Sequence, residues 1–492
     1  MKQRLSVGFS LAMCLVLIVS IVASAGSTTK NLVTNFTLSN LSTTDATGSI
    51  TYYKEDGTAW TGSGYTSFGP GQAHELPGNG GQLVVRQYSD TLAAGRGSVV
   101  VTSNVAVSAV VQERLAPGDT ALPTSGAYVG FTEGSSLFYL PLVQKNRSTS
   151  TGIGNSQIMV QNTGSAVIPL VDINLVAEPG SGSLPATYTK SISNLAAGAT
   201  FFYDLADDTN ITNGWNGSAE VDAHAGKVAV VSNSFNGANA LRTYNGFPVE
   251  SIYNKWAIPL FASQLTNGLN TSVSVQNLGA EIPVGDLVLD CGAFTKSNAT
   301  AIPTKGTYGF NPINGVPSAY PTNWQGACTI TAPGNVVAFV IMRRITGNGD
   351  QAAYEALSYA STDTNVFIPL MAKRLPNGFA TSAVVQNLSS SSAFVDVIWT
   401  HSATECLATP CNDYTVPNVE IPGNGNMTLN LRVTSGGGSG IPAGLPDGWQ
   451  GTVKVIPHPS TTARPLVGYV VLSSLNASAG DNYRAHRLLT LP

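Results

Sequence analysis

Apolar and polar residues alternate over short stretches of this chain, and one such stretch recurs four times. Each copy ends at an asparagine, and the residues before it are apolar at every second position. The four asparagines are Asn40, Asn162, Asn277 and Asn387, which are separated by 122, 115 and 110 residues. A period of two predicts a β-strand with one face on a core. A repeat of this length is typical of a whole domain, so the pattern predicts four related units.

Two further motifs recur in the last three units. Each unit opens with an apolar residue followed by Pro-Leu, at Pro141-Leu142, Pro259-Leu260 and Pro369-Leu370. Later comes a Trp-x-Gly element, at Trp215-Asn216-Gly217, Trp324-Gln325-Gly326 and Trp449-Gln450-Gly451. In the first unit Gly97 stands in the same phase without a tryptophan. We expect each tryptophan to pack over the end of its unit, with the glycine allowing a turn or bulge. We expect the asparagine amides to satisfy backbone groups where the strand ends.

Seven or eight short strands in about 115 residues, with no long helical periodicity, predict an all-β chain of β-sandwich domains. The predicted boundaries are 26–135, 136–252, 253–363 and 364–492, after a leader at 1–25. The connections between units are short, for example 248–255 and 361–365, which predicts a semi-rigid rod. The first domain is the most diverged of the four.

This pattern resembles that of secreted bacterial surface proteins made of tandem immunoglobulin-like or fibronectin-like β-sandwich domains. The resemblance covers essentially the whole chain after the leader and rests on architecture alone. It implies four tandem immunoglobulin-like β-sandwich domains. Architecture of this kind does not by itself fix a function.

The N-terminus is typical of a secretory signal peptide that spans residues 1–25. Lys2 and Arg4 supply the positive charge, residues 11–22 are almost entirely apolar, and Ala23-Ser24-Ala25 fits the small-x-small cleavage pattern. No later stretch reaches the roughly 18–20 apolar residues that a membrane helix needs. We therefore expect a secreted protein at the extracellular cell surface, with no transmembrane segment in the mature chain.

Cleavage after Ala25 would leave the first unit without an opening strand. The 18 residues from Pro259 to Asn277, projected back from Asn40, reach Val22, which lies inside the signal peptide. A missing strand leaves a sheet edge open, and such an edge can accept a strand from another chain. Head-to-tail polymerisation by strand addition at this unit is therefore one hypothesis. The alternatives are a degenerate strand at residues 27–33 or a smaller sheet. For the leader itself the alternatives are an uncleaved membrane anchor and a lipoprotein site at Cys14.

Composition and charge narrow the class of partner. Of the 492 residues, 11% are charged, which is less than half the roughly 25% of an ordinary soluble protein. The formal net charge is −4, a balance that argues against a nucleic acid held by phosphate neutralisation. A surface with few charges suits close lateral packing, because few charges must be desolvated at contacts.

Outside the leader the chain has four cysteines, an even number that favours disulfides in an exported protein. Cys291 and Cys328 both fall in the inward phase of their strands, so we expect a bridge between them in the third unit. Cys406 and Cys411 flank four residues and are expected to pin a loop in the fourth unit. A zinc site would need four ligands in one place. The two pairs lie in different units, so no metal is expected.

Three other sets of residues are candidate sites. The tryptophans Trp215, Trp324 and Trp449 are candidates for stacking on sugar rings, as the alternative to core packing. The cluster of Asp204, Asp207 and Asp208 suits a Ca²⁺ loop or an acid–base pair, with a solvated turn as the alternative. Sequons make six asparagines candidates for glycosylation. They are Asn146, Asn216, Asn270, Asn298, Asn426 and Asn476.

These features favour a non-enzymatic extracellular protein with a structural or adhesive role, such as a subunit of a filament, a surface layer or an adhesin stalk. Its expected partners are copies of itself, other cell-surface components or polysaccharide. The alternatives are a secreted carbohydrate-binding protein and a secreted hydrolase with its site in one unit. No Gly-x-Ser-x-Gly, His-Glu-x-x-His or phosphate-loop motif occurs in the sequence, and no cofactor is expected.

Overall fold

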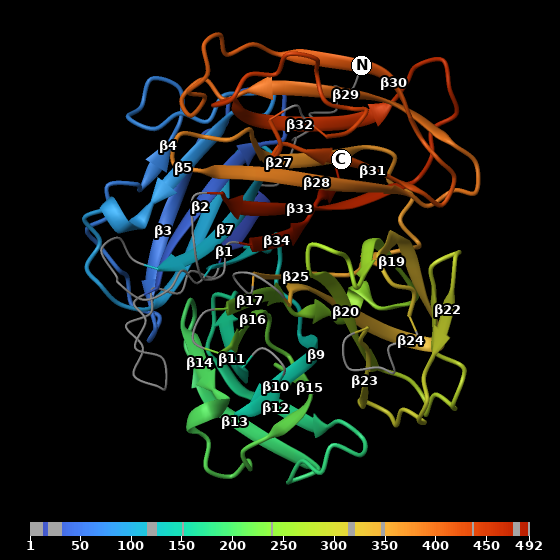
Figure 1. The fold of residues 1–492 in the computed structure, drawn as a ribbon. Coiled ribbons are helices and arrows are strands. Elements are labelled where there is room, and N and C mark those ends of the chain that lie inside the picture. The colour runs from blue at the N-terminus through green and yellow to red at the C-terminus, as the bar shows by residue number, and fades with distance from the viewer. Residues whose placement is uncertain are drawn as a thin grey trace, which may run out of the picture.

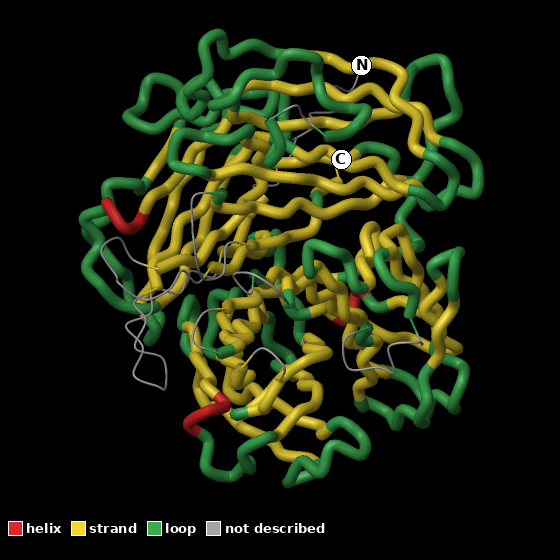
Figure 2. Tube along the Cα trace, in the orientation of Figure 1, coloured by secondary structure: helices red, strands yellow, loops and turns green. Residues whose placement is uncertain are grey.

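Antiparallel β-sheets make up nearly all of the described structure, which confirms the predicted all-β class (Figure 1 and Figure 2). The computed structural model describes residues 13–17, 32–115, 125–149, 152–237, 240–312, 320–345, 350–434, 437–475 and 483–490. Within these ranges the helices are three 3₁₀ turns, η1 (Gln87–Ser89), η2 (Leu205–Asp207) and η3 (Val249–Ser251). The same ranges contain no helix with the length and apolar character needed to cross a membrane.

The strands fall into four sets, named units 1 to 4 here. Unit 1 contains β1 (Met13–Leu17), β2 (Leu32–Asn40), β3 (Gly48–Lys54), β4 (Ser67–Phe68), β5 (Gln82–Arg86), β6 (Gly97–Ser103), β7 (Val107–Leu115) and β8 (Ser125–Val129). Unit 2 contains β9 (Leu137–Lys145), β10 (Arg147–Thr149), β11 (Gly152–Asn162), β12 (Ile168–Ala177), β13 (Thr187–Leu195), β14 (Thr200–Asp204), β15 (Trp215–Asp222), β16 (Val228–Asn236), β17 (Ala240–Asn245) and β18 (Phe247–Pro248). Unit 3 contains β19 (Tyr253–Ser263), β20 (Leu269–Asn277), β21 (Val288–Asp290), β22 (Thr295–Ser297), β23 (Thr307–Phe310), β24 (Trp324–Arg344), β25 (Gln351–Glu355) and β26 (Leu357–Ser358). Unit 4 contains β27 (Val366–Ala372), β28 (Phe379–Asn387), β29 (Ala393–His401), β30 (Tyr414–Ile421), β31 (Asn426–Asn430), β32 (Gln450–Pro457), β33 (Leu466–Ser474), β34 (Tyr483–Arg487) and β35 (Leu489–Thr490).

The same strand order occurs in every unit. One sheet, the outer sheet, runs β4-β3-β6-β1, β13-β12-β15-β9, β22-β21-β24-β19 and β30-β29-β32-β27 in units 1 to 4. The other sheet, the inner sheet, runs β5-β2-β7-β8, β14-β11-β16-β17, β23-β20-β24-β25 and β31-β28-β33-β34. We call β1, β9, β19 and β27 the opening strands, and β8, β17, β25 and β34 the inner strands. In unit 3 the 21-residue strand β24 belongs to both sheets.

Apolar side chains from the two sheets of a unit share one core, as the alternating pattern requires. In unit 4, Val395 and Val397 of the outer sheet lie in one buried cluster with Val385 and Leu429 of the inner sheet. Full burial of one such side chain contributes roughly 1.5–3 kcal/mol. The repeated apolar positions before the four asparagines are therefore buried in the cores of their units.

The units do not form the rod that their short connections predict. Their inner strands contact one another in a closed order, from β8 to β17, β25, β34 and back to β8. Figure 1 shows β17, β25 and β34 close together near the centre of the molecule. Every residue of β8, β17 and β25 is buried, and Val110 and Ala127 of unit 1 lie in the core cluster of unit 4. The rod prediction is wrong because it rested on the short connections alone, and those connections do not show that the inner strands are buried between units.

Polar groups from all four units meet at one end of the inner strands. The Nδ2 of Asn245 donates to the carbonyl of Val129 at 2.8 Å, and the backbone N–H of Asn245 donates to the Glu355 carboxylate. Burial raises the pKa of Glu355, and the charge of Arg487 opposes that rise. These hydrogen bonds tie units 1, 2 and 3 together, and the charge of Arg487 in unit 4 acts on the same carboxylate.

Candidate interaction site

The Pro-Leu motif forms a β-bulge in the opening strands β9, β19 and β27. Pro141 and Leu142 lie opposite a single residue of β15, because Leu140 pairs with Ala219 and Val143 pairs with Gly217. The same register shift occurs between Ile258 and Phe261 in β19 and between Ile368 and Met371 in β27. Proline fits this position because it has no backbone N–H to leave unpaired.

The glycine of the Trp-x-Gly motif pairs with the residue that directly follows the bulge, as Gly217 does with Val143. A Cβ atom on Gly217 would lie 2.1 Å from the carbonyl oxygen of Val176, and one on Gly451 would lie 2.0 Å from that of Thr400. A larger residue would therefore force the neighbouring strand away. The two recurring motifs are the two sides of one local structure.

Each bulge exposes a proline carbonyl that binds the inner sheet of the next unit. The carbonyl of Pro141 accepts hydrogen bonds from Thr307 Oγ1 and Ser274 Oγ of unit 3, both at 2.9 Å. The Pro259 carbonyl accepts from Asn426 Nδ2 of unit 4 at 2.6 Å. The Pro369 carbonyl of unit 4 accepts from Gln82 Nε2 at 2.5 Å. Three of the four junctions in the ring therefore use the same bond.

Thr200 occupies the matching position at the fourth junction, between units 1 and 2. It pairs with Gln161 in the sheet just as Thr307 pairs with Gln276 and Asn426 pairs with Gln386. Thr200 is 1% exposed, and its hydroxyl finds no hydrogen-bond partner among the described residues. A buried hydroxyl without a partner costs about 1–3 kcal/mol, so this position calls for an acceptor.

A serine hydroxyl of the outer sheet makes the same hydrogen bond at the junction between units 1 and 2 as at the next one. The Ser98 hydroxyl donates to the carbonyl of Gly198 at 2.9 Å. The equivalent Ser218 hydroxyl donates to the carbonyl of Lys305 at 2.5 Å. The backbone N–H of Thr200 also donates to the backbone carbonyl of Glu55 in unit 1 at 3.0 Å. The missing bond is therefore specific to the opening strand of unit 1.

The opening strand of unit 1 is Met13–Leu17, which belongs to the predicted signal peptide. Leu17 pairs with Val99 of β6, and the equivalent pair in unit 2 is Leu140 with Ala219. The bulge would therefore begin directly after Leu17, outside the described residues. Apart from these five residues, the predicted leader at 1–25 also lies outside them. Leu32–Asn40 forms β2, which pairs with β5 and β7 and not with this edge.

The four repeated asparagines cap the ends of their strands, as predicted. Each is buried, and its Nδ2 donates at 2.8 Å to a carbonyl three or four residues further along the chain. Each Oδ1 accepts a bond from the backbone N–H two residues further on. The asparagines shape the loops that follow the central strands, and they leave no amide group for a ligand.

Two of the three candidate tryptophans pack in the core. Trp215 and Trp449 are fully buried, and their indole N–H groups donate to the carbonyls of Pro185 and Asn412, both at 3.0 Å. Neither has a free face for a sugar. Trp324 is half-buried and packs edge-on against Phe294, with the ring centroids 5.0 Å apart.

Unit 1 fills the place of the missing tryptophan differently. Trp60, which lies beyond the hairpin turn after β3, is buried over Gly95, and a Cβ atom on Gly95 would lie 3.1 Å from its ring. Gly95 stands two residues before Gly97, where the other units carry tryptophan. An indole ring therefore lies close to this position in unit 1 too, although the tryptophan comes from another part of the chain.

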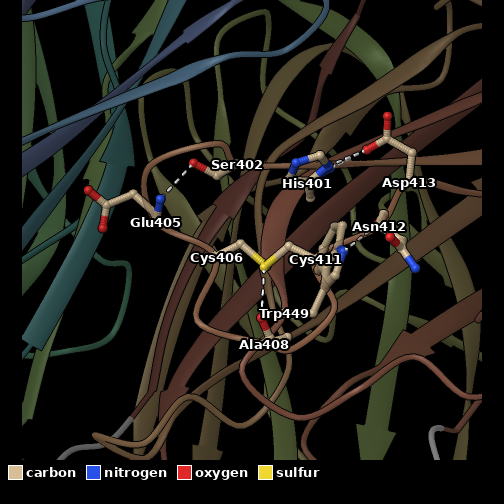
Figure 3. The surroundings of a disulfide bond; sticks show 9 residues. All are labelled: His401, Ser402, Glu405, Cys406, Ala408, Cys411, Asn412, Asp413 and Trp449. Atoms are coloured by element: carbon tan, nitrogen blue, oxygen red, sulfur yellow. Dashed lines mark hydrogen bonds and ion pairs between the residues drawn. A yellow bond between two sulfur atoms is a disulfide. The ribbon is translucent and has the colours of Figure 1, made fainter.

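Both expected disulfides are present. Cys291 is bonded to Cys328 in unit 3, and Cys406 is bonded to Cys411 in unit 4. Figure 3 shows the second bridge beside Trp449 and the loop that carries Glu405. The Glu405 carboxylate lies 2.5 Å from Nη2 of Arg86 in unit 1. The short disulfide loop therefore takes part in the contact between units 4 and 1.

The aspartate cluster is a structured turn. The carboxylate of Asp208 accepts hydrogen bonds from the hydroxyls of Tyr203 at 2.8 Å and Tyr188 at 3.0 Å, and from the backbone of Asn210 at 2.9 Å. Burial opposes its ionisation, but these bonds outweigh burial and hold the pKa of Asp208 below its ordinary value. Burial raises the pKa of Asp204. Among the described residues no group of His, Cys, Asp or Glu side chains is arranged to hold a metal ion.

Burial argues against a glycan on several of the candidate sequons in the folded chain. Asn216, Asn270 and Asn298 are at most 7% exposed, and the amide nitrogen of each already donates a hydrogen bond. Asn426 uses its nitrogen on Pro259. Asn146 bonds to Asn213 at an exposed position, and Asn476 lies outside the described residues. Asn146 is the described candidate with the most room for a glycan.

Comparison with known proteins supplies no relative. No family model and no curated protein matches the chain. A viral chemokine binding protein, R17 of rodent gammaherpesvirus Peru, aligns over 74% of this chain and 88% of its own, at 8% identity and a TM-score of 0.15. A putative membrane anchored protein of Corynebacterium diphtheriae aligns over 94% of this chain and 98% of its own, at 8% identity and a TM-score of 0.09. Scores this low do not establish a shared fold.

Proposed function

We propose that this chain is an exported, non-enzymatic structural or adhesive protein of the cell surface, built from four immunoglobulin-like β-sandwich domains. The observation that carries the proposal is the closed contact of the inner strands, which joins the four units into one body. Two disulfides fit an oxidising, extracellular environment. A block of this kind suits a repeating assembly, such as a filament or a surface layer.

The ring favours such an assembly over an adhesin stalk. A stalk needs domains that follow one another in space, so that each added domain adds length. Here unit 4 returns to unit 1 through the bond from Gln82 to Pro369 and the ion pair of Arg86 with Glu405. The four units therefore make the protein a compact block and do not lengthen it as the domains of a stalk would.

The proposal is tested by locating the protein and imaging what it forms. Cells that express the full chain are fractionated, and the released or surface-bound protein is viewed by negative-stain electron microscopy with a specific antibody. We expect labelled fibres or lattices outside the cell. Leu17→Arg, which interrupts the apolar part of the leader, should keep the protein inside the cell, whereas Val16→Leu should not. Protein that stays inside, or that is exported but remains dispersed at high concentration, would contradict the proposal.

The carbohydrate-binding alternative keeps one point of support in Trp324, which retains exposed surface. If this alternative holds, binding on a glycan array should vanish in Trp324→Ala while the circular dichroism spectrum is unchanged. Loss of binding without loss of fold would replace the structural proposal, because a structural subunit has no need of this side chain.

A further inference from the structure

The three complete junctions define what fits the opening-strand position of unit 1. In β9, β19 and β27 an apolar residue, any residue, a second apolar residue and then Pro-Leu follow in order. The three segments are Phe138-Tyr139-Leu140-Pro141-Leu142, Trp256-Ala257-Ile258-Pro259-Leu260 and Val366-Phe367-Ile368-Pro369-Leu370. In each case the two apolar residues pair with the positions that Val101 and Val99 hold in β6.

We propose that, in the chain cleaved after Ala25, the edge of β6 is a strand-acceptor site. Its occupant is an extended segment of a partner polypeptide with the pattern apolar-x-apolar-Pro-Leu, running antiparallel to β6. The proposal rests on the export and cleavage that the proposed function requires. Before cleavage, Met13–Leu17 fills the site from within the chain.

The chemistry of the site matches this occupant at three points. Val99 and Val101 are at most 1% exposed and belong to the core of unit 1, and an incoming strand with apolar residues opposite them takes the place where β1 pairs before cleavage. The edge of β6 offers backbone groups to an incoming strand. The carbonyl of the incoming proline supplies the acceptor that the Thr200 hydroxyl lacks, as Pro141 supplies it for Thr307.

The occupant is a different polypeptide and not a second folded copy. In the described part of the chain every strand with this pattern already pairs within its own molecule: β9 with β15, β19 with β24, and β27 with β32. A second copy could donate one of them only by opening its own ring. A partner with an unpaired segment of this pattern pays no such cost.

The test uses the exported protein and a peptide copied from residues 365–373, which contain β27. Intact mass first establishes where the exported chain begins. The labelled peptide is then titrated into that protein and binding is followed by fluorescence anisotropy. We expect one peptide per chain, and no binding of a peptide that carries Ile368→Asp. The uncleaved precursor should bind neither peptide, because β1 occupies the site.

Two variants of the protein test the geometry. Thr200→Val should weaken peptide binding about threefold to tenfold, the range expected for one hydrogen bond, without loss of fold. The matched variant Thr307→Val should leave peptide binding unchanged, because its bond lies at another junction. If the cleaved chain is unfolded alone and folds with the peptide, the proposal is supported as well.

Three outcomes would overturn the proposal, and they are distinguishable. An exported chain that retains residues 13–17 fills its own site, which leaves export intact but removes the acceptor. A cleaved, folded chain that does not bind the peptide has no acceptor site. Self-association that the peptide dissolves would assign the site to a second copy and not to another polypeptide. Failure of export itself would instead contradict the proposed function.

Discussion

The junction between units 1 and 2 lacks the proline acceptor that the other three junctions have. At the three complete junctions a proline carbonyl from an opening strand meets a polar side chain of the next unit: Thr307, Asn426 or Gln82. At the remaining junction Thr200 is in place, but the strand that should face it comes from the predicted leader. The same architecture is thus complete in three places and depends on a removable segment in the fourth.

This difference shows how a repeated fold can acquire a specialised site. The surrounding contacts, such as the bond from Ser98 to Gly198, are kept. Only the strand that completes the edge has changed its source. Other departures from fourfold equivalence, at Trp60, at the disulfide of unit 3 and at His486, allow the contribution of each unit to be measured separately.

The largest expected effect is at the tryptophan position. Trp449→Ala should lower the free energy of unfolding by about 3–5 kcal/mol, because it empties a fully buried site in unit 4. Trp60→Ala should cost roughly 2 kcal/mol, since Trp60 borders the surface and its site can relax. Urea unfolding followed by circular dichroism measures both. Equal losses of unfolding free energy would mean that Trp60 stabilises unit 1 as much as Trp449 stabilises unit 4.

Removal of the disulfides has the next largest expected effect on stability. The Cys291–Cys328 bridge spans 37 positions and the Cys406–Cys411 bridge spans 5. In the chain-entropy model, removing the first by Cys291→Ala with Cys328→Ala should cost about 4 kcal/mol, and removing the second about 2 kcal/mol. Urea unfolding of the two double variants gives the comparison. A larger loss from the short loop would show that its contact with Arg86 matters more than loop closure.

His486 predicts an acid effect confined to unit 4. In the inner strand β34 it stands at the position that Tyr128, Tyr244 and Tyr354 occupy in the inner strands of units 1, 2 and 3. Burial lowers its pKa to about 4 from an ordinary value near 6.5. As the pH falls from 6.5 to 4, His486 binds a proton in the unfolded chain but stays neutral in the folded chain. The free energy of unfolding therefore falls by about 2–3 kcal/mol.

The variant His486→Tyr restores the residue of the other units and should remove that part of the acid sensitivity. Unfolding at pH 7 and pH 4.5 measures it. His224→Asn is the matched control, because His224 is 47% exposed and should leave the loss in place. An unchanged loss in His486→Tyr would assign the acid effect to other groups.

The smallest effect addresses the junctions directly. Thr307→Val should destabilise the chain by about 1–2 kcal/mol, since it removes the donor to Pro141. In the cleaved chain Thr200→Val should be neutral or slightly stabilising, because that hydroxyl has no partner among the described residues. Thermal unfolding of both variants is sufficient. Equal destabilisation would show that Thr200 has an acceptor after all.

The local pattern predicted the strands well, because burial of one face repeats every second residue. It also predicted the core role of Trp215 and Trp449 and the capping role of the asparagines. It could not reveal the ring. The inner strand β25 reads Gln351-Ala352-Ala353-Tyr354-Glu355, and its polar ends suggest a surface, yet Glu355 is buried against Asn245 of another unit.

The junction residues were missed for a related reason. Gln82, Thr200, Thr307 and Asn426 are equivalent in the sheet but differ in type, so no repeated letter marks them. What they share is a side chain able to donate a hydrogen bond at the start of one strand. That property becomes visible only when the carbonyl it faces is known.

Ring closure also removes the distinction between first and last modules. Since Ser39 and Gln82 both bond to the carbonyl of Pro369, units 1 and 4 are neighbours in space although they lie furthest apart of the four along this sequence. A circular permutant, with old ends joined by a linker and new ends opened within 361–365, would keep every such contact. The order of the four modules along the chain is therefore not what determines their arrangement in space.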